Sequence, residues 1–366
     1  MKILFAIKTL DKVQGGAERV LADLTSGLAD RGHNVAVLSF DKPKGKSFYP
    51  LNKKVKRVHL GIGDVKRKAT FREVISRMIA IRKAATRMEP DIVVAFMHST
   101  FIPASFAMIG TGVPIIASEH IVPDHYQNKK WEYRLLCLSR FFVKKITVLS
   151  QSIIESYTPS LRPKMHAIAN PVHPVKRLAD PKGIDKERKI ILNVGRLTDQ
   201  KDQETLIKAF ALLAHDYPDW DVKIIGEGDL RHNLETIISD LKLKHRVSMP
   251  GITPKIEREY QSAHIFALPS KYESFGLATA EAMAHALPTL GFATCPGTNE
   301  LISHKENGLL IEGQDRVQVF AQGLKALMDE PNLRYKLGQQ GLRTVQQFRP
   351  DRIVKQWEDL IMSSLQ

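Results

Sequence analysis

The stretch KIILNVG, residues 189–195, decides the architecture that we expect for this chain. It is a short apolar run of the kind that forms a buried strand, and a helical pattern (ETLIKAFALLAHDY) follows it. The alternation then continues through DVKIIGEG, VSMPG, HIFALPS, LPTLGF and GLLIE. Strands that alternate with helices indicate a parallel sheet with helices on both faces. Residues 189–350 are therefore predicted to form one α/β domain.

The same order occurs earlier in the chain, where KILFAI, NVAVLSF, DIVVAF and PIIASEH are apolar runs and ERVLADLTSGLADRG has a helical pattern. Residues 1–170 are thus predicted to form another α/β domain, in line with a chain of 366 residues being too long for one ordinary domain. The expected fold is two Rossmann-like, open parallel-sheet domains. Because ligands collect at the carboxyl ends of parallel strands, we expect the domains to face each other across a cleft.

Two further segments complete the domain plan. Residues 171–188 begin with a proline-containing stretch that lacks periodicity, which is typical of a linker. Residues 351–366 carry Ile353, Trp357 and Leu360 at helical spacing. We expect this last helix to pack at the seam between the domains.

Composition excludes several classes of protein. The two cysteines lie in separate halves of the chain, so neither a disulfide framework nor a cysteine metal site is indicated. The first ten residues, MKILFAIKTL, are typical of a buried strand rather than a signal peptide, and no uncharged apolar stretch of about 20 residues is present. These features predict a cytoplasmic protein without a membrane-spanning segment.

Charge is distributed unevenly. Residues 1–170 contain 28 Lys and Arg against 13 Asp and Glu, whereas residues 171–366 contain 26 of each kind. The whole formal excess of +15 therefore belongs to the first half. Such asymmetry favours an anionic partner for that half, which leaves nucleic acid, anionic lipid and a phosphorylated acceptor as alternatives.

The stretch KYESFGLATAEAMA, residues 271–284, contains two carboxylates eight positions apart, Glu273 and Glu281. One interpretation places them on the solvated face of an ordinary helix. The other places Glu273 at a helix entry near Gly276 and Glu281 two or three turns away along one wall, where the pair could hold several hydroxyls of a polyol.

Three other short motifs follow apolar runs. Gly15-Gly16 precedes a helix, and such glycines allow close approach to a phosphate, although a flexible turn is the alternative. Gly195-Arg196 with Lys201 offers two cations for a diphosphate, although these could be solvated surface charges. Glu119-His120 ends a predicted strand. By contrast, the D-x-D pattern at 219–221 precedes its strand, so we interpret it as a turn.

Together these residues resemble glycosyltransferase family 4, a group of retaining transferases with the GT-B fold. The motifs that carry the resemblance extend over nearly the whole chain: Gly15-Gly16-Ala17-Glu18, Ser118-Glu119-His120, Asn170-Pro171, Gly195-Arg196 with Lys201, Gly226-Glu227-Gly228, and Glu273 with Glu281.

The resemblance implies a role for each matching residue. Arg196 and Lys201 would neutralise the donor diphosphate, and Gly16 would offer its backbone N–H. Glu281 would hold the ribose. Glu273 and the backbone near Gly276 would orient the donor sugar, and His120 would reach that sugar from the first domain. The donor-binding set is Gly15, Gly16, Gly195, Arg196, Lys201, Gly251, Ile252, Glu273, Phe275, Gly276, Leu277 and Glu281, and the catalytic set is His120, Glu273, Arg196 and Lys201.

The implied reaction retains the anomeric configuration by front-face attack and needs no metal or other cofactor. A UDP-linked hexose or N-acetylhexosamine is the first choice of donor, and GDP-mannose is the next. Two rival hypotheses remain: a nucleotide-sugar epimerase, whose extra acid and base carboxylates are not identifiable here, and a nucleic-acid binder, for which no groove-reading module is recognisable. We expect no nucleic-acid partner.

The acceptor is predicted from the basic first half. Residues 66–88 and 134–145 read as amphipathic helices with cations around an apolar face, either as core-facing helices or as helices that bind an anionic membrane surface. The residues assigned to this role are Arg72, Arg77, Lys83, Arg134, Lys144 and Lys145. Similar enzymes bind the acceptor in the first domain, so we expect a glycan acceptor linked to a lipid diphosphate and a peripheral position at the inner face of the cell membrane.

Overall fold

The computed structural model describes residues 1–11, 15–65, 67, 69–184 and 186–366. The chain divides into two compact units: Met1–Pro171 together with Pro350–Gln366, and Val172–Arg349. The chain thus passes between the units twice. Residues 172–184, which were expected to be part of the linker, are grouped with the carboxy-terminal unit, and the last helix is grouped with the amino-terminal unit.

The amino-terminal unit contains a seven-stranded parallel sheet in the order β3-β2-β1-β4-β5-β6-β7. Its central strands are buried along their whole length, as expected where helices cover both faces. The strands are β1 (Lys2–Ile7), β2 (Asn34–Ser39), β3 (Lys56–His59), β4 (Ile92–Phe96), β5 (Ile115–Ser118), β6 (Lys145–Val148) and β7 (Met165–Ala167).

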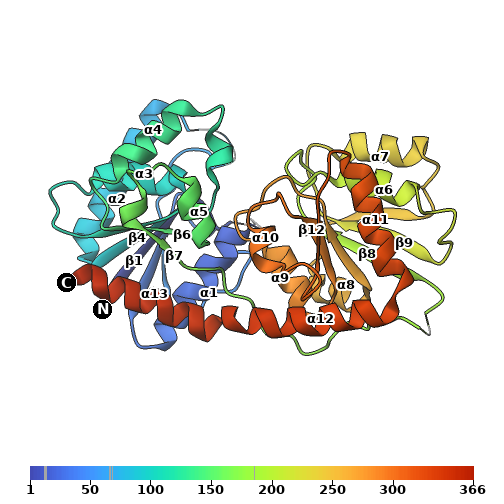
Figure 1. Ribbon diagram of the computed structural model, residues 1–366. Coiled ribbons are helices and arrows are strands. Elements are labelled where there is room, and N and C mark those ends of the chain that lie inside the picture. Colours follow the sequence, from blue (N-terminus) through green and yellow to red (C-terminus); the bar gives the residue numbers. More distant parts are fainter. Residues whose placement is uncertain (12–14, 66, 68, 185) are drawn as a thin grey trace. The chain divides into compact units, whose positions relative to one another are not determined.

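The helices of this unit include one that comes from the other end of the chain (Figure 1). They are α1 (Gly16–Asp30), α2 (Phe71–Met88), α3 (His98–Ala107), α4 (Lys130–Ser139), α5 (Gln151–Ser156), α13 (Pro350–Leu365) and the 3-10 turns η1 (Pro123–Tyr126) and η2 (Arg162–Lys164). Helix α2 begins with a capping box, in which the Thr70 hydroxyl accepts from the Glu73 N–H and the Glu73 carboxylate accepts from the Thr70 N–H.

Helix α13 packs on α1 through close contact. A Cβ on Gly27 of α1 would lie only 2.6 Å from Val354 Cγ2, so glycine is needed for the two helices to approach. Trp357 is 2% exposed and stacks on Phe96 of β4 with 5.9 Å between ring centroids. The Glu358 carboxylate contacts Arg31 and His33, each at 2.7 Å. The last helix is therefore part of the amino-terminal core.

The carboxy-terminal unit contains a six-stranded parallel sheet in the order β10-β9-β8-β11-β12-β13. Its strands are β8 (Lys189–Val194), β9 (Trp220–Ile225), β10 (Val247–Gly251), β11 (Ile265–Leu268), β12 (Thr289–Phe292) and β13 (Leu309–Ile311). Its helices are α6 (Gln203–Ala211), α7 (Arg231–Asp240), α8 (Ile256–Ser262), α9 (Leu277–Ala284), α10 (Thr298–Leu301), α11 (Arg316–Asp329), α12 (Pro331–Val345) and the turn η3 (Gln346–Phe348). Both sheets confirm the fold class expected from the sequence.

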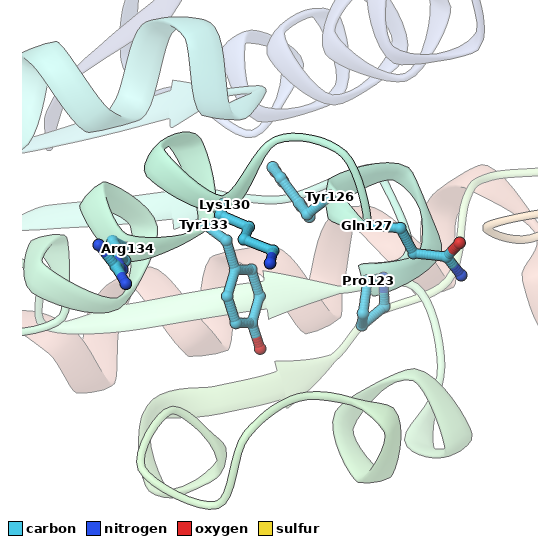
Figure 2. Close-up of a pocket in the computed structure, with 6 residues that line it drawn as sticks. All are labelled: Pro123, Tyr126, Gln127, Lys130, Tyr133 and Arg134. Carbon is cyan, nitrogen blue, oxygen red and sulfur yellow. The ribbon is translucent and has the colours of Figure 1, made fainter.

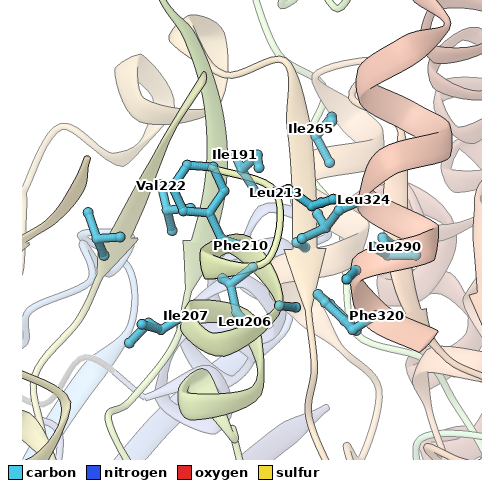
Figure 3. Close-up of a cluster of buried hydrophobic side chains, with 14 of the residues drawn as sticks. Ile191, Leu206, Ile207, Phe210, Leu213, Val222, Ile265, Leu290, Phe320 and Leu324 are labelled. Carbon is cyan, nitrogen blue, oxygen red and sulfur yellow. The ribbon is translucent and has the colours of Figure 1, made fainter. Parts of the chain in front are cut away.

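Figure 3 shows the core on one face of this sheet, where Phe210 of α6 lies near Ile191 of β8 and Val222 of β9, and Phe320 of α11 lies near Leu290 of β12. Beside this core, Arg334 is fully buried over the Trp220 ring. Its guanidinium donates to the carbonyls of Pro181 and Lys182, both at 2.5 Å. These bonds fasten the segment that follows Val172 to the carboxy-terminal unit.

Helix length and composition also bear on membrane insertion. In the part of the chain that the structure describes, no helix is both long enough and apolar enough to cross a bilayer.

Candidate functional site

The topology of the carboxy-terminal sheet determines where a ligand can enter it. Strands β8 and β11 are neighbours, but the chain leaves them toward opposite edges of the sheet. In open parallel sheets, the carboxyl ends of two such strands are where a crevice for a ligand is expected. The loop at residues 195–202 and the loop at residues 269–276 follow these two strands and border the expected crevice. They contain half of the twelve residues predicted for the donor.

Hydrogen bonds join these two loops. The Gln200 side chain donates to the Tyr272 carbonyl at 2.9 Å, and the Lys271 N–H donates to the Gln200 carbonyl at 2.9 Å. The Lys271 ammonium contacts the Asp199 carboxylate at 2.5 Å. The loops consequently hold a fixed relative position without a ligand.

Lys201 and Glu273 form an ion pair between the loops, with 2.5 Å between Nζ and Oε1. The two side chains are only 14% and 8% exposed. A poorly solvated ammonium attracts anions strongly, because little water screens it. An entering phosphate oxygen could therefore replace the carboxylate as the partner of Lys201 and release Glu273 for hydroxyl groups. Arg196 begins the same loop, is exposed, and its carbonyl accepts from the Gln203 side chain at 2.9 Å.

The Gly226-Glu227-Gly228 motif packs directly against the first of these loops. A Cβ on Gly226 would lie 1.9 Å from the Gly195 carbonyl oxygen, and one on Gly228 would lie 2.3 Å from that of Leu197. Only glycine allows this approach of main chain to main chain. The next strand ends at Gly251, which has a φ of 89°, and Ile252 beyond it is 52% exposed.

Helix α9 begins at Leu277, directly after Gly276, which serves as its N-cap with a φ of 78°. Glu281 lies inside this helix, where one carboxylate oxygen accepts from the Tyr260 hydroxyl at 2.9 Å. Glu273 is 6% exposed and precedes the helix, so it does not lie on a solvated helix face, whereas Glu281 is half-buried within α9. The first interpretation is therefore excluded for Glu273. Phe275 is 6% exposed and contacts the Phe348 ring, which leaves mainly its backbone for a ligand.

Two supporting features were not predicted from the sequence. Tyr260 is 1% exposed, stacks on His285 and holds the Glu281 carboxylate, although it lies 21 positions away in the chain. Arg316 of α11 donates to Asp202 at 3.0 Å and to the Pro269 carbonyl at 2.6 Å, so its guanidinium connects the two loops. Neither residue belongs to a recognisable motif, since each acts through contacts between distant segments.

The amino-terminal sheet has the same kind of divergence between β1 and β4. Gly15 and Gly16 follow β1, and a Cβ on Gly15 would lie 1.9 Å from Glu18 Oε2. The Glu18 carboxylate, in the first turn of α1, thus lies against Gly15. Residues 12–14 of this loop lie outside the described residues.

Glu119 and His120 lie at the carboxyl end of β5. The Glu119 carboxylate accepts from the N–H groups of His120 and Ile121, at 2.9 and 3.1 Å, and from the Tyr126 hydroxyl at 2.7 Å. Burial nevertheless raises the pKa of Glu119 to about 7. Burial lowers the pKa of His120 to about 4, so this imidazole is neutral near pH 7. Its Nε2 lies 3.0 Å from Ser118 Oγ.

The cations assigned to the acceptor or membrane do not all lie on the surface. Arg72 and Lys83 of α2, Arg134 of α4 and Lys144 are exposed, as expected. Arg77 is only 4% exposed: its guanidinium lies 4.6 Å from the Phe40 ring centroid and donates to the Ile62 carbonyl. The expectation that Arg77 belongs to the outward-facing set is therefore wrong.

Lys145 also has an internal partner, because its ammonium donates to the Ser363 hydroxyl of α13 at 2.8 Å. It begins β6 and is half-buried, so its charge is less accessible than that of Lys144.

The D-x-D pattern lies at the amino end of β9, away from the crevice. Trp220 and Asp221 are part of the strand, so the interpretation of all three residues as a turn is wrong. Asp219 pairs with Lys189, and Asp221 pairs with Arg188 and Arg246. Among the described residues, no three His, Cys, Asp or Glu side chains are grouped closely enough to hold a metal ion.

Comparison with known proteins extends over the same two units. Among curated proteins, the chain is 26% identical to an uncharacterized glycosyltransferase of Haemophilus influenzae over 98% of this chain and 99% of that protein. It is 28% identical, over 99% of this chain and 98% of the relative, to the GalNAc-alpha-(1->4)-GalNAc-alpha-(1->3)-diNAcBac-PP-undecaprenol alpha-1,4-N-acetyl-D-galactosaminyltransferase of Campylobacter jejuni.

Solved structures of transferases share the fold. Sucrose-phosphate synthase from Thermosynechococcus elongatus matches with a TM-score of 0.85 at 19% identity, covering 99% of this chain and 98% of the other. Anabaena HepE in complex with UDP and glucose matches with a TM-score of 0.81 at 20% identity, covering 99% of this chain and 100% of the other.

The sequence also matches models of known protein families. The model for Glycosyltransferase Family 4 matches residues 14–176, and the model for Glycosyl transferases group 1 matches residues 175–344. Together they extend over most of both units, and the solved structures that match have the same two-sheet fold. The chain therefore belongs to the GT-B glycosyltransferases that join a family 4 domain to a group 1 domain.

Proposed function

We propose that this glycosyltransferase moves a hexose or N-acetylhexosamine from a UDP-sugar to a glycan acceptor linked to a lipid diphosphate, with retention of anomeric configuration and without a metal. Two comparisons support the choice of substrates. The Campylobacter relative is named for an undecaprenol-diphosphate-linked glycan acceptor, and the HepE structure contains UDP and glucose. The acceptor would be an intermediate in the assembly of a bacterial surface glycan.

The Lys201–Glu273 ion pair is the observation that carries the proposal. A nucleotide sugar has a diphosphate for the cation and hydroxyl groups for the carboxylate. Both groups come from loops that border one crevice, and Arg196 adds a second, exposed cation to the same loop. Glu281, held by Tyr260, supplies a further acceptor for the hydroxyls of the ribose.

In the proposed reaction, the acceptor hydroxyl attacks the anomeric carbon on the side from which the diphosphate departs. The bond between the anomeric carbon and the diphosphate oxygen breaks as the bond to the acceptor oxygen forms, and the departing diphosphate oxygen takes the hydroxyl proton. Lys201, Arg196 and backbone N–H groups stabilise the leaving negative charge, which is an electrostatic form of catalysis. The neutral imidazole of His120 would hydrogen-bond the donor sugar from the amino-terminal unit.

The surface of α2 and α4 supports a peripheral position at an anionic membrane. Phe71 and Ile79 of α2 are 81% and 50% exposed, and Trp131 and Leu138 of α4 are 74% and 50% exposed. Both helices pack against α3, so the two sets belong to one helical layer (Figure 1). The same two helices expose cations, namely Arg72 and Lys83 of α2 and Arg134 of α4. Lys144, which follows α4 in the chain, is exposed as well. Exposed apolar side chains among cations are typical of proteins that bind anionic lipid surfaces.

A donor panel tests the proposed activity. The protein is incubated with UDP- and GDP-linked sugars and a lipid-diphosphate-linked glycan, and release of nucleoside diphosphate is measured with and without excess EDTA. We expect release with a UDP-sugar, undiminished by EDTA, and an α-linked product from an α-linked donor by NMR. A strict need for Mg²⁺ or Mn²⁺, or an inverted product, would contradict the mechanism. Interconversion of the sugar without transfer would identify an epimerase.

A further inference from the structure

A pocket of about 410 Å³ lies on the surface of the amino-terminal unit, between η1 and α4. Figure 2 shows its lining side chains, with Arg134 at one end and Pro123 and Gln127 at the other. The complete lining is Pro123, Tyr126, Gln127, Lys130, Tyr133 and Arg134. None of these six described residues is acidic.

The lining combines apolar walls with two cations. Tyr126, Tyr133 and Pro123 provide ring surfaces, while Lys130 and Arg134, one helical turn apart on α4, are both exposed. The Tyr126 hydroxyl donates to buried Glu119 and the Tyr133 hydroxyl accepts from the Thr158 N–H, so the two rings are fixed. In Figure 2, Arg134 lies at one end of the pocket and Lys130 lies nearer its middle. Two cations beside rigid aromatic rings suit a phosphate group, which accepts charge-assisted hydrogen bonds.

The neighbouring face of α4 indicates what carries that phosphate. Trp131, Leu135 and Leu138 are 74%, 42% and 50% exposed and lie at helical spacing beside the pocket residues. The Arg134 guanidinium lies 4.9 Å from the Trp131 ring centroid, so the cationic end of the pocket adjoins this apolar face. A ligand with a phosphate and hydrocarbon chains would satisfy both surfaces at once, whereas a free phosphate would leave the apolar face in water.

We propose that this pocket binds the phosphate group of a single lipid molecule, whose chains lie along Trp131, Leu135 and Leu138. The pocket wall is linked to the candidate site, because Tyr126 holds the same Glu119 carboxylate that accepts from the His120 N–H. The role of the pocket rests on the proposed function: the bound lipid would position a lipid-linked acceptor near the carboxyl end of β5.

Three probes separate the phosphate from the chains: dihexanoylphosphatidylglycerol below its micellar concentration, glycerol 3-phosphate, which lacks the chains, and dihexanoylglycerol, which lacks the phosphate. Binding is measured by isothermal titration calorimetry with the full chain. Tryptophan emission reports the location, because Trp220 and Trp357 are each 2% exposed and Trp131 is the one exposed residue of the chain's three tryptophans, all of which the structure describes.

Two variants with the same loss of charge test the pocket. The Lys130→Gln/Arg134→Gln variant should bind the short-chain phospholipid at least tenfold more weakly, because it removes two charge-assisted donors to the phosphate. The Lys53→Gln/Lys56→Gln variant changes two exposed cations of the same unit that have no assigned role, and it should bind within about twofold of the unmodified protein. All four residues are exposed, so both variants should keep their unfolding temperatures.

Each alternative result contradicts the proposal. Equal weakening in both double variants would show a general effect of charge rather than a pocket. Glycerol 3-phosphate binding as tightly as the phospholipid would identify a soluble phosphate ligand, and dihexanoylglycerol binding equally would remove the phosphate from the interaction. Release of UDP from UDP-sugars, measured without any lipid, tests the proposed donor activity separately, so the failure of one inference is distinguishable from the failure of the other.

Discussion

The amino-terminal and carboxy-terminal units have the same parallel plan but use their charged side chains differently. In the carboxy-terminal unit, cations near the crevice pair with carboxylates of the same unit, as in Lys201 with Glu273 and Arg316 with Asp202. In the amino-terminal unit, cations such as Arg72, Lys83 and Arg134 are exposed on helices that also expose Phe71 and Trp131.

The difference indicates two ways of handling an anion. In the first unit, surplus charge remains on the surface, where salt screens it and an extended anionic surface can meet it. In the second unit, the proposed donor would displace an internal carboxylate from Lys201. Such an exchange would be selective, because only a ligand that also satisfies the released carboxylate gains fully from it. The amino-terminal unit holds 30 basic against 16 acidic side chains, and the carboxy-terminal unit holds 24 against 23, in agreement with this division.

The first prediction tests whether the two units have independent hydrophobic cores. Trp357→Ala should destabilise the amino-terminal unit by about 3–5 kcal/mol, because it removes a buried ring that stacks on Phe96. Phe320→Ala should cost the carboxy-terminal unit a similar amount, since Phe320 is fully buried against Phe292. Hydrogen exchange with mass spectrometry should show faster exchange in the altered unit alone. Equal acceleration in both units would mean that they unfold together.

The buried ion pair gives the next largest effect. Lys201→Met keeps the length of the side chain but removes its charge, and should lower kcat/KM about 100- to 1000-fold, as loss of a preorganised electrostatic group does. Lys325→Met is the matched control, because Lys325 pairs with Asp329 on the solvent-exposed face of α11 in the same unit. A loss of activity that Lys325→Met reproduces would assign the effect to stability rather than to the site.

The pH dependence of stability sharpens the comparison within the first unit. Burial raises the pKa of Glu119 to about 7 from 4.5, so its contribution to stability is fully present below pH 4.5 and is lost as the pH rises to 7. Burial also lowers the pKa of His98 and of His120 to about 4 from 6.5, so their contributions are present above pH 6.5 and are lost as the pH falls to 4.

Glu119→Gln removes only the first of these opposing contributions. The stability of the variant, measured by urea unfolding, should therefore rise more steeply than that of the unmodified protein between pH 4.5 and 7. The difference should reach at most about 3 kcal/mol, because one unit of pKa corresponds to about 1.4 kcal/mol. Parallel curves for the two proteins would show that Glu119 does not titrate in this interval.

The two glutamates of the second unit should separate in kinetics. Glu281→Gln should mainly raise KM for the donor by about tenfold or more, since hydroxyls of the ribose are held alike in the ground and transition states. Glu273→Gln should mainly lower kcat, if its contacts tighten at the reacting sugar. Steady-state kinetics with the donor distinguish the outcomes, and equal small changes in both would argue against a role in donor binding.

The smallest effects concern the basic helix α2. Arg77→Gln should lower stability by about 1–2 kcal/mol, because it removes the contact with Phe40 and the bonds to the Ile62 carbonyl. Arg72→Gln and Lys83→Gln should leave stability unchanged and weaken sedimentation with anionic vesicles by about 1 kcal/mol each at low salt. If Arg77→Gln weakened vesicle binding as much as Arg72→Gln, without unfolding, Arg77 would belong to the surface set after all.

The alternation of apolar and helical patterns was sufficient to predict the fold, because each buried strand of a parallel sheet leaves a continuous apolar run. Residues 189–194 form β8 as the opening motif indicates, and the helix predicted after Gly276 is α9. Two residues of the predicted donor set do come together, since Lys201 and Glu273 pair between loops at the carboxyl ends of adjacent strands.

Contacts between distant segments could not be predicted in the same way. Periodicity showed that Ile353 and Trp357 share a buried face, but not that the face packs on α1 and β4. Helical spacing likewise placed Arg77 among outward cations, because nothing local reveals the Phe40 ring beneath it. Tyr260 lies in a short helix without any motif, and only the fold brings it to Glu281.

The return of α13 to the first unit has a consequence for how the protein is made. During translation, the residues of the carboxy-terminal unit are all synthesised before Trp357 is available to cover Phe96. That unit is continuous in sequence and can condense as soon as it leaves the ribosome, whereas the amino-terminal sheet, although synthesised first, waits with an uncovered apolar face until residues 350–365 emerge. We expect the apolar face that α13 covers to remain open to chaperones until residues 350–365 have emerged.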